Sequence, residues 1–380
     1  MGGRPRRVNG ARNPDGRGTP RGTVAGSPHR GPTIRSVPRI GSIAEFDLRE
    51  CAMPPAPMHL TRSDLEAAAA LVHSRMEPTP QRRWPLLEEA TGTETWVKHE
   101  NMTPTGAFKL RGAITFIDWL KRTHPDAPGI VTATRGNHGQ GQAREATAAG
   151  LIAKVYVPRG NATEKNEAMR GFGAELIEHG DDFDEAREEA FRVAEAEGLF
   201  PVPPFHPELV RGVATHAYEL LTAVPDLDAI YVPIGCGSGV CGTILARNAL
   251  GSNAEVIGVV SENAPTAKLS VEAGELIPTN DARTFADGMA VRVPVQEAFD
   301  IYRTGAARIV TVSDEDVAEA IRLLFRTTHH TAEGAGAAPL AALMNERERM
   351  AGRKVAFILC GGNIDTAWMA TVLSGGVPEV

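Results

Sequence analysis

The chain has 380 residues, 42% of them hydrophobic, which is enough apolar material to bury a full core in one large domain or two ordinary ones. Its net charge of −7 disfavours non-specific nucleic-acid binding, because neutralising phosphates requires a basic surface. No apolar run approaches the roughly 18 residues that a membrane span needs, so we expect neither nucleic-acid nor membrane partners and a role with a small molecule.

The first 58 residues differ in composition from the rest of the chain. Residues 1–40 carry nine Arg against a single Asp, together with many Gly and Pro, and such a segment cannot build a core. We therefore predict that residues 1–58 are a disordered basic extension that the chemistry does not need. A transit peptide, a nucleic-acid arm and translated sequence upstream of a start at Met53 or Met58 are the alternatives.

After a helix predicted at 61–76, short β-rich runs alternate with helical patterns, and this alternation predicts parallel sheets. In a first block, strands are expected at 129–134, 153–158, 174–179 and 199–204, with helices between them at 139–150, 164–173 and 184–198. In a second block, the pattern predicts strands at 229–235, 255–262, 308–313 and 354–360, and helices at 210–223, 240–250, 265–274 and from Asp314.

These blocks predict an α/β fold: two open parallel-sheet domains with helices on both faces and an active site in the cleft between them. The expected limits place a large domain at 59–124 and 206–380 and a small α/β domain at 125–205. No internal repeat of solenoid period is visible, which argues against a repeat protein.

The segment KHENMTPTGAFKLRGA at 98–113 contains the densest group of unusual residues, a Pro-Thr-Gly turn that leads into Phe108, Lys109 and a helical run. The chain has only seven Lys against thirty-three Arg, so a lysine beside an aromatic residue and after a turn is unexpected for a solvated charge. Lysine, unlike arginine, loses its proton when desolvated, and its amine forms imines. Lys109 is therefore the candidate catalytic residue, although a lone lysine at a helix start is more often a surface residue.

A second motif, TATRGNHGQGQA at 132–143, places Gly136, Asn137 and His138 between a predicted strand and a predicted helix. Backbone N–H groups at such a helix start bind anions, including a substrate carboxylate. The neutral side chain of Asn137 is able to hydrogen-bond a cofactor oxygen without competing for its proton. Taken alone, the stretch also suits a simple turn with a helix cap.

A third motif, YVPIGCGSGVCG at 231–242, is a strand followed by four glycines and a helix. Glycines let consecutive backbone N–H groups converge on a phosphate, and the helix dipole adds positive charge. The same stretch satisfies GxGxxG from Gly237 to Gly242, and Glu262 lies twenty residues further on, as in dinucleotide-binding proteins. A nicotinamide- or flavin-dependent oxidoreductase is therefore a rival hypothesis, although it leaves the Lys109 segment unexplained.

Cys360 ends the buried-looking strand of the segment VAFILCGGNID at 355–365. At a strand end, its thiol is a weak neutral donor that is able to face the ring nitrogen of a cofactor. A structural buried cysteine is the commoner interpretation of such a residue. The chain's four cysteines, Cys51, Cys236, Cys241 and Cys360, form no CxxC pair, and this usage favours a reducing, cytoplasmic compartment.

Taken together, the four stretches resemble the threonine/serine dehydratase group of fold-type II pyridoxal-phosphate enzymes, which share the fold of the tryptophan synthase β chain, over residues 60–370. The resemblance implies that Lys109, after Phe108, holds pyridoxal 5′-phosphate as an imine and acts as the base. It implies that Cys360 contacts the pyridine nitrogen, that a glycine loop binds the cofactor phosphate, and that a Ser/Thr-x-Gly-Asn-His loop binds the substrate carboxylate. The implied phosphate loop comprises Gly235, Cys236, Gly237, Ser238 and Gly239, and the implied substrate loop comprises Thr134, Arg135, Gly136, Asn137 and His138.

The chain departs from this family pattern at several positions. Ala107 stands where many members have Ser, and Cys236 and Ser238 replace two glycines of the phosphate loop. Arg135 stands where racemases carry an acid/base Ser, and racemisation is disfavoured because arginine does not release a proton at neutral pH. Lys268 occupies the place of an acid that holds a divalent cation in some members, so no metal is predicted.

These inferences predict an ammonia-lyase that converts a 3-hydroxy amino acid, L-threonine or L-serine first, into a 2-oxo acid and ammonia by β-elimination. Threo-3-hydroxyaspartate is the second candidate substrate, because Arg135 would pair with its additional carboxylate by a bidentate contact. A β-replacement synthase on the same scaffold is a third possibility. The family resemblance also implies a homodimer.

Four further residues attract attention by their type. Glu333 in TAEGAGAAPL is expected near the cofactor from the family resemblance, or else in a helix-capping or solvated role. Asp287, His329 and His330 are expected to be structural, because nothing in the sequence fixes their partners.

Overall fold

The computed structural model describes residues 58–380. The predicted basic extension at 1–58, apart from Met58, lies outside the described residues, as does Cys51. Among the described residues, no helix is long and apolar enough to cross a membrane.

The first described helix, α1 (Arg62–His73), begins where the sequence predicts it. Its N-cap is Thr61, whose hydroxyl accepts a hydrogen bond from the Asp64 N–H, while the Asp64 carboxylate accepts one from the Thr61 N–H. The helix ends three residues before the predicted limit at 76, with Ser74 as its C-cap residue.

Six strands form the larger sheet: β1 (Gln81–Arg83), β2 (Glu94–His99), β7 (Ala229–Pro233), β8 (Glu255–Ser261), β9 (Arg308–Val312) and β10 (Lys354–Leu359). Their order is β1-β2-β10-β7-β8-β9, and all neighbours run parallel except β1, which is antiparallel to β2. The four strands predicted in the second block are confirmed. The sequence pattern does not predict β1 or β2, and the three polar residues of β1 show no apolar alternation.

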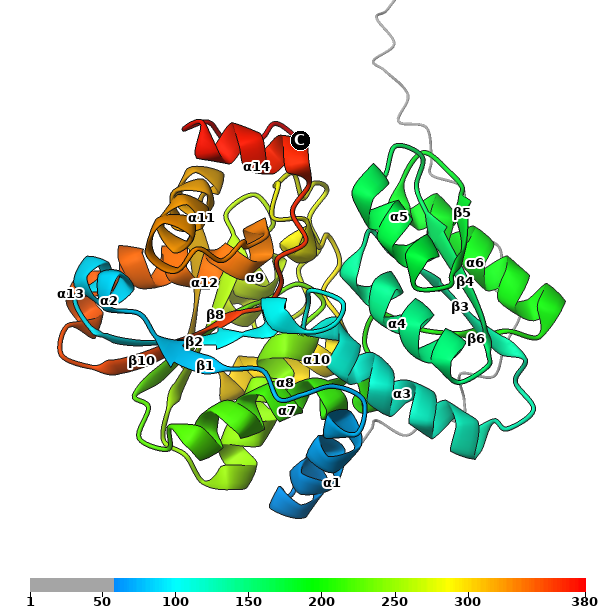
Figure 1. Ribbon diagram of the computed structural model, residues 1–380, viewed down its shortest axis with the longest axis horizontal. Helices are drawn as coiled ribbons and strands as arrows, with labels where there is room; N and C mark the ends of the chain where they lie inside the picture. Colours follow the sequence, from blue (N-terminus) through cyan, green and yellow to red (C-terminus); the bar gives the residue numbers. More distant parts are fainter. Residues whose placement is uncertain (1–57) are drawn as a thin grey trace, which may run out of the picture. The chain divides into compact units, whose positions relative to one another are not determined.

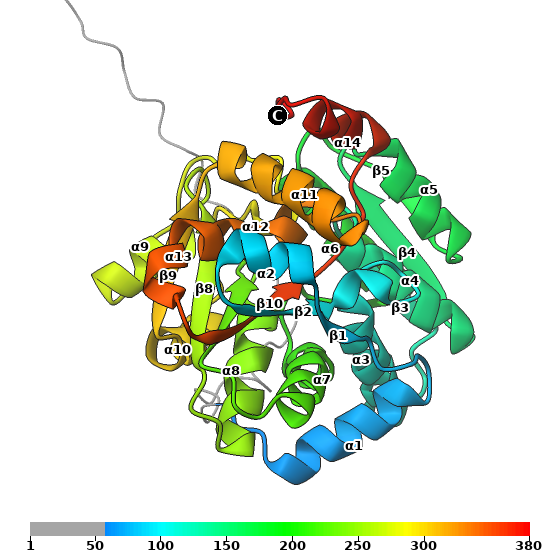
Figure 2. The ribbon, with the colours of Figure 1, turned by 60° about the vertical axis from the view of Figure 1, so that its left-hand side comes forward.

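Nine helices belong to the same part of the described chain: α2 (Pro85–Thr91), α7 (Pro207–Ala223), α8 (Ser238–Leu250), α9 (Thr266–Ala273), α10 (Gln296–Gly305), α11 (Asp314–Thr328), α12 (Gly334–Asn345), α13 (Arg347–Met350) and α14 (Thr366–Leu373). They cover both faces of the larger sheet, with α11 and α12 on one side and α7 and α8 on the other (Figures 1 and 2). α12 packs against β7, β8, β9 and β10, and α8 packs against β7 and β8. The larger sheet is therefore buried on both faces.

The sequence pattern does not predict α12 either. Its sequence, GAGAAPLAALMN, is apolar on every side, and every residue from Gly334 to Leu343 is buried. A helix that is buried all round has no polar face, so it lacks the amphipathic period by which helices are recognised. Glu333 precedes this helix as its N-cap residue.

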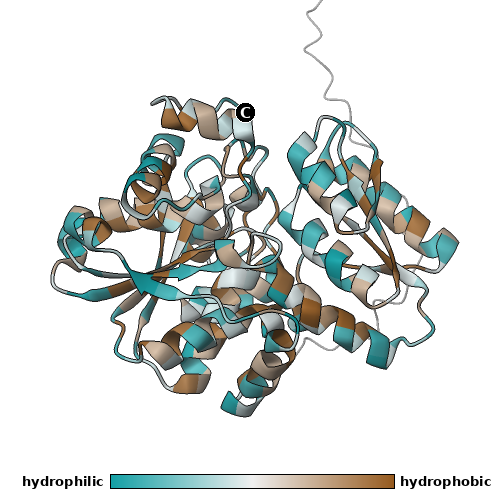
Figure 3. Cartoon of the chain, in the orientation of Figure 1, coloured by the Kyte–Doolittle hydropathy of each residue, from teal (hydrophilic) through white to brown (hydrophobic). Residues whose placement is uncertain are grey.

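Four parallel strands form the smaller sheet in the order β5-β4-β3-β6: β3 (Gly129–Ala133), β4 (Ile152–Val157), β5 (Glu175–Glu178) and β6 (Phe200–Pro201). Their connecting helices are α4 (Asn137–Ala148), α5 (Thr163–Gly171) and α6 (Phe183–Glu197). α6 packs on the face that carries Val131 and Tyr156, whereas Met169 of α5 packs on the face that carries Val155. The charged helix α5 is mostly hydrophilic in Figure 3, whereas the strands of the smaller sheet are largely hydrophobic. The predicted block is confirmed, although β6 is shortened because prolines lack the N–H donor that a sheet needs.

The helix α3 (Lys109–Thr123) packs against α7 from the larger layer and against α4 from the smaller one. The approach of α3 to α7 is close, since a Cβ on Gly212 would lie 2.1 Å from the Arg111 carbonyl oxygen. The two sheets therefore flank a helix whose first residue is Lys109. The domain limits at 125 and 205 stay a prediction.

Candidate active site

Backbone hydrogen bonds tie the end of β10 to the start of α3. The Phe108 N–H donates to the Cys360 carbonyl oxygen at 2.9 Å, and the Gly362 N–H donates to the Gly106 carbonyl oxygen at 2.9 Å. These bonds hold Lys109, the first residue of α3, beside Cys360. Two motifs about 250 residues apart in the sequence therefore meet, as the resemblance implies.

The Lys109 side chain is half-buried at this junction. Its Nζ donates to the Ser238 hydroxyl oxygen at 3.0 Å and lies 4.8 Å from the centroid of the Phe108 ring. Burial lowers the pKa of Lys109. A lysine whose pKa is lowered toward neutrality is suited to accept and return a proton.

The predicted phosphate loop connects β7 to α8, which begins at Ser238. Gly237 has a φ of 97°, a left-handed conformation that glycine adopts without strain. A Cβ on Gly239 would lie 3.6 Å from the Phe108 ring. The loop therefore brings the first N–H groups of a 13-residue helix close to Lys109, and such a helix start attracts anions.

The predicted substrate loop connects β3 to α4, which begins at Asn137, two residues earlier than predicted. The Thr134 hydroxyl accepts a hydrogen bond from the Gly136 N–H at 3.1 Å and so fixes the turn. The Asn137 amide donates to Glu333 at 2.7 Å and accepts from the Asn363 amide at 2.8 Å. Residues from the end of β10 and the start of α12 therefore orient the start of α4.

His138 follows Asn137 on α4. Burial and the nearby Lys109 lower the pKa of His138 to about 3, so its ring is neutral at pH 7. Its Nε2 atom is buried and has no hydrogen-bond partner among residues 58–380. A buried polar atom without a partner is rare in proteins and is consistent with a ligand site.

Glu333 is 2% exposed, which contradicts a solvated role. It is the N-cap residue of α12, but its side chain accepts no hydrogen bond from that helix and instead accepts one from Asn137. Burial and the nearby Asp287 raise the pKa of Glu333 to about 8, so the carboxyl group is mostly protonated at pH 7. Its second oxygen, Oε2, has no partner within the described residues.

Glu333→Gln should stabilise the cofactor-free protein relative to wild type increasingly as pH rises from 6 to 8. The folded wild type keeps a proton on Glu333 that the unfolded chain, with a pKa near 4.5, has released, so wild-type stability falls as pH rises toward 8. The slope is at most about 1.4 kcal/mol per pH unit. Urea unfolding at several pH values measures it, with Glu188→Gln on the exposed face of α6 as the control. A stability difference that is constant with pH would contradict the protonated state of Glu333.

The three described cysteines, Cys236, Cys241 and Cys360, are free thiols. Burial raises the pKa of each, so all three are neutral at pH 7. Cys241 directs its thiol to the Ala298 carbonyl oxygen at 3.5 Å, which is a structural contact. Cys360 is close enough to Lys109 for the two groups to affect one another's pKa.

Arg135 does not join the group around Lys109. Its side chain is exposed and forms no ion pair with residues 58–380. Lys268, which stands at the predicted position of a lost cation ligand, pairs with Glu272 on α9. Within the described part of the chain, no group of three or more His, Cys, Asp or Glu side chains is placed to hold a metal ion.

The three residues expected to be structural each have identifiable surroundings. Asp287 forms an ion pair with Lys165. His329 ends α11 in the left-handed conformation, with a φ of 56°. The His330 ring packs against the buried His99 ring, with the centroids 4.6 Å apart.

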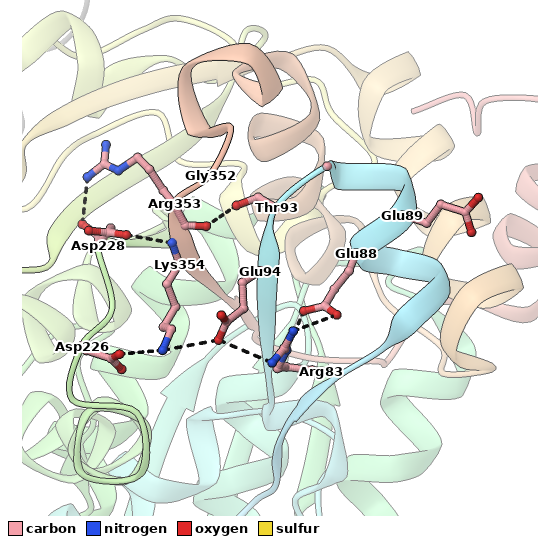
Figure 4. Close-up of a pocket in the computed structure, with 11 residues that line it drawn as sticks. Arg83, Glu88, Glu89, Thr93, Glu94, Asp226, Asp228, Gly352, Arg353 and Lys354 are labelled. Carbon is pink, nitrogen blue, oxygen red and sulfur yellow. Dashed lines mark hydrogen bonds and ion pairs between the residues drawn. The ribbon is translucent and has the colours of Figure 1, made fainter.

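A surface hollow of about 710 Å³ lies elsewhere, at the amino ends of β2, β7 and β10 (Figure 4). Its charged lining residues pair with one another, as Lys354 does with Asp226 and Arg83 does with Glu88. Ligands of parallel α/β sheets bind at the carboxyl ends of the strands, which is where the loops around Lys109 lie. We therefore keep the surroundings of Lys109 as the candidate active site and assign no function to this hollow.

Two residues close to the site were not predicted to act there. Asn363 donates to Asn137, and Lys165 packs beside the substrate loop. Lys165 carries the same sequence signal as Lys109, since both belong to the seven lysines of an arginine-rich chain. Asn363 has no such signal, because its partner Asn137 lies 226 residues away.

Comparison with known proteins places these features in a family. The family model described as "Pyridoxal-phosphate dependent enzyme" matches residues 73–361. The L-threonine ammonia-lyase of Thermotoga maritima is 34% identical, with 84% of this chain and 79% of the relative covered. The L-threo-3-hydroxyaspartate ammonia-lyase of Saccharomyces cerevisiae is 31% identical, with 83% of this chain and 97% of the relative covered.

A solved structure, the threonine deaminase of T.th., aligns with a TM-score of 0.76 at 32% identity and covers 80% of this chain and 99% of that one. The likeness covers most of the chain, so the fold-type II architecture is confirmed. The rival dinucleotide-binding hypothesis fails, because the family model matches the Lys109 segment and the glycine loop together. The chain belongs to the family of pyridoxal-phosphate dependent enzymes.

Proposed function

We propose that the chain is an ammonia-lyase that converts L-threonine or L-serine into a 2-oxo acid and ammonia by β-elimination. The observation that carries the proposal is the half-buried amine of Lys109, held 3.0 Å from the Ser238 hydroxyl between the starts of two helices. The names of the Thermotoga maritima relative and of the solved threonine deaminase support the choice of substrate.

The residues of the site fit pyridoxal phosphate. Lys109 offers an amine, and the glycine loop offers backbone N–H groups to a phosphate. His138 Nε2 and Glu333 Oε2 are buried without partners among residues 58–380, and a ligand with several polar atoms would satisfy them. When bound, pyridoxal phosphate withdraws electron density from the substrate Cα, which makes the Cα proton acidic and allows the β-hydroxyl to leave.

Each residue of the chain then has a distinct task. Lys109 removes the Cα proton, because its lowered pKa leaves the amine able to accept one. The N–H groups of Asn137 and His138 at the start of α4 bind the substrate carboxylate. Residues 235–239 hold the phosphate, the Phe108 side chain lies beside the amine, and the neutral thiol of Cys360 is a weak donor for the ring nitrogen.

The purified protein tests this proposal directly. We expect it to absorb visible light in the manner of an enzyme with bound pyridoxal phosphate, and to release 2-oxo acid and ammonia in equal amounts from L-threonine or L-serine. A β-replacement synthase would instead form a new amino acid when a thiol is supplied, so a thiol donor should leave the yield of 2-oxo acid unchanged. A cofactor-loaded protein that releases no ammonia from either substrate would contradict the proposal.

Threo-3-hydroxyaspartate is a second candidate substrate. Arg135 is an exposed cation in the substrate loop, without an ion-pair partner among the described residues, and the Saccharomyces cerevisiae relative is named for this substrate. We expect Arg135→Ala to lower kcat/KM for threo-3-hydroxyaspartate about tenfold or more, because a charge-assisted contact is lost. L-threonine turnover should change less than twofold. Arg159→Ala is the control, because Arg159 is an exposed arginine of the same α/β layer. Equal turnover of hydroxyaspartate by wild type and Arg135→Ala would exclude this role.

We also propose a homodimer in a reducing, cytoplasmic compartment. The dimer is implied by the family resemblance. The compartment is supported by the three free thiols, Cys236, Cys241 and Cys360, among the described residues.

A further inference from the structure

Lys165 lies on α5 next to the substrate loop, and its side chain is 6% exposed. Its aliphatic part packs against Gly136, where an ideal Cβ would lie 2.9 Å from Lys165 Cδ. Its ammonium forms an ion pair with Asp287, the first residue of the short helix η3 (Asp287–Met289). One side chain therefore joins the substrate loop of the smaller sheet to a segment that packs with the larger one.

The helix η3 also contacts the phosphate loop. A Cβ on Gly235 would lie 2.2 Å from the Gly288 carbonyl oxygen, so the two backbones are in close contact. On its other side, a Cβ on Gly334 would lie 2.6 Å from Ala286 Cα. The segment is thus held between the phosphate loop and the start of α12, next to Glu333, and has little freedom to move independently of either.

The Lys165 ammonium stays charged in this place. Burial acts to lower the pKa of Lys165, but the ion pair with Asp287 opposes burial, and the net shift raises the pKa above its usual value. Lys165 therefore stays paired with the Asp287 carboxylate next to Gly136, and this pair gives it a geometric route to the substrate loop.

We propose that Lys165 is a positioning residue for substrate binding: through its ion pair with Asp287 it holds the substrate loop in register with the phosphate loop. The choice of substrate rests on the proposed function, whereas the contacts between the two loops do not. Loss of this pair should weaken binding of the substrate more than it slows proton transfer at Lys109.

Kinetics of the holoenzyme test the proposal. Lys165→Met keeps most of the aliphatic chain and removes the charge, and Asp287→Asn removes the partner. We expect each to raise KM for L-threonine about tenfold and to leave kcat within about threefold. The double variant should lie within about twofold of the single variants, because the two side chains act as one pair. Lys154→Met, which removes an ion-paired lysine from β4 of the same sheet, should leave KM unchanged.

Amide hydrogen exchange at residues 134–138, measured without substrate, gives a readout that is independent of turnover. We expect exchange there to be at least about fivefold faster in Lys165→Met and unchanged in Lys154→Met. If the wild type proves inactive on L-threonine, the proposed function fails while the exchange data still test the connection between the loops. Three results would each overturn the proposal. The first is that Lys165→Met exchanges at 134–138 as slowly as the wild type. The others are a wild-type KM in either single variant and a KM shift in the double variant that equals the product of the single shifts.

Discussion

Lys109→Ala is expected to lose at least about a thousandfold in turnover and to purify without covalently attached cofactor. In the proposed function, Lys109 supplies both the amine that attaches pyridoxal phosphate and the base that removes the Cα proton. Its polar neighbour within hydrogen-bonding distance is the hydroxyl of Ser238, which cannot form an imine. Borohydride reduction followed by peptide mass mapping measures the attachment, and the wild type should be labelled at Lys109.

Lys121→Ala is the matched control, because Lys121 lies on the same helix and is exposed. This variant should keep wild-type turnover, visible absorbance and labelling. Full turnover by a Lys109→Ala protein that still carries covalently bound pyridoxal phosphate would contradict both roles. Loss of the covalently attached cofactor with normal turnover would contradict the role of Lys109 as the base, but not its role in attaching the cofactor.

The second large effect is expected at Arg111, two residues further along α3. Its guanidinium is fully buried and donates to Glu100 (Nε to Oε2, 2.6 Å) and to Glu219 (Nη1 to Oε1, 2.6 Å). The fully buried Lys98 also donates to Glu219. Two cations therefore balance two carboxylates inside the core, directly behind the helix turn that presents Lys109.

Arg111→Met should lower the free energy of unfolding by about 3–5 kcal/mol, because it leaves two buried carboxylates with a single cation. Thermal and urea unfolding measure this loss. Arg122→Met on the same helix removes an exposed ion pair with Asp118 and should cost less than about 1 kcal/mol. Equal losses in the two variants would show that the buried pairs contribute no more than a surface pair.

The same ion pairs predict how that loss depends on pH. Burial raises the pKa of Glu219, but Arg111 and Lys98 outweigh burial and lower the pKa to about 2. A carboxylate whose folded pKa lies below its unfolded value near 4.5 stabilises the fold above that value, and the stability is lost as pH falls toward 2. The difference between wild type and Arg111→Met should therefore be complete at pH 7 and should shrink below pH 4.5.

Local patterns predict much of the fold. Between 129 and 205, short apolar runs and helical periods predict every strand and helix of the smaller sheet. The same reasoning misses β1, which forms through pairing with β2, and α12, which is apolar on every side because it lies inside the protein. Both elements depend on their neighbours rather than on a pattern of their own.

For the candidate site, the sequence is enough to predict which segments carry chemistry, because a rare lysine after an aromatic residue, a Gly-Asn-His turn and a glycine loop are all local signals. Only the tertiary structure shows the hydrogen-bond partners of those segments. Asn137, for example, bonds Glu333 and Asn363, which lie 196 and 226 residues away along the chain. The protonated state of Glu333 arises in the same way. Burial and the surrounding charges set its pKa, and these come from several elements that no single stretch of sequence contains.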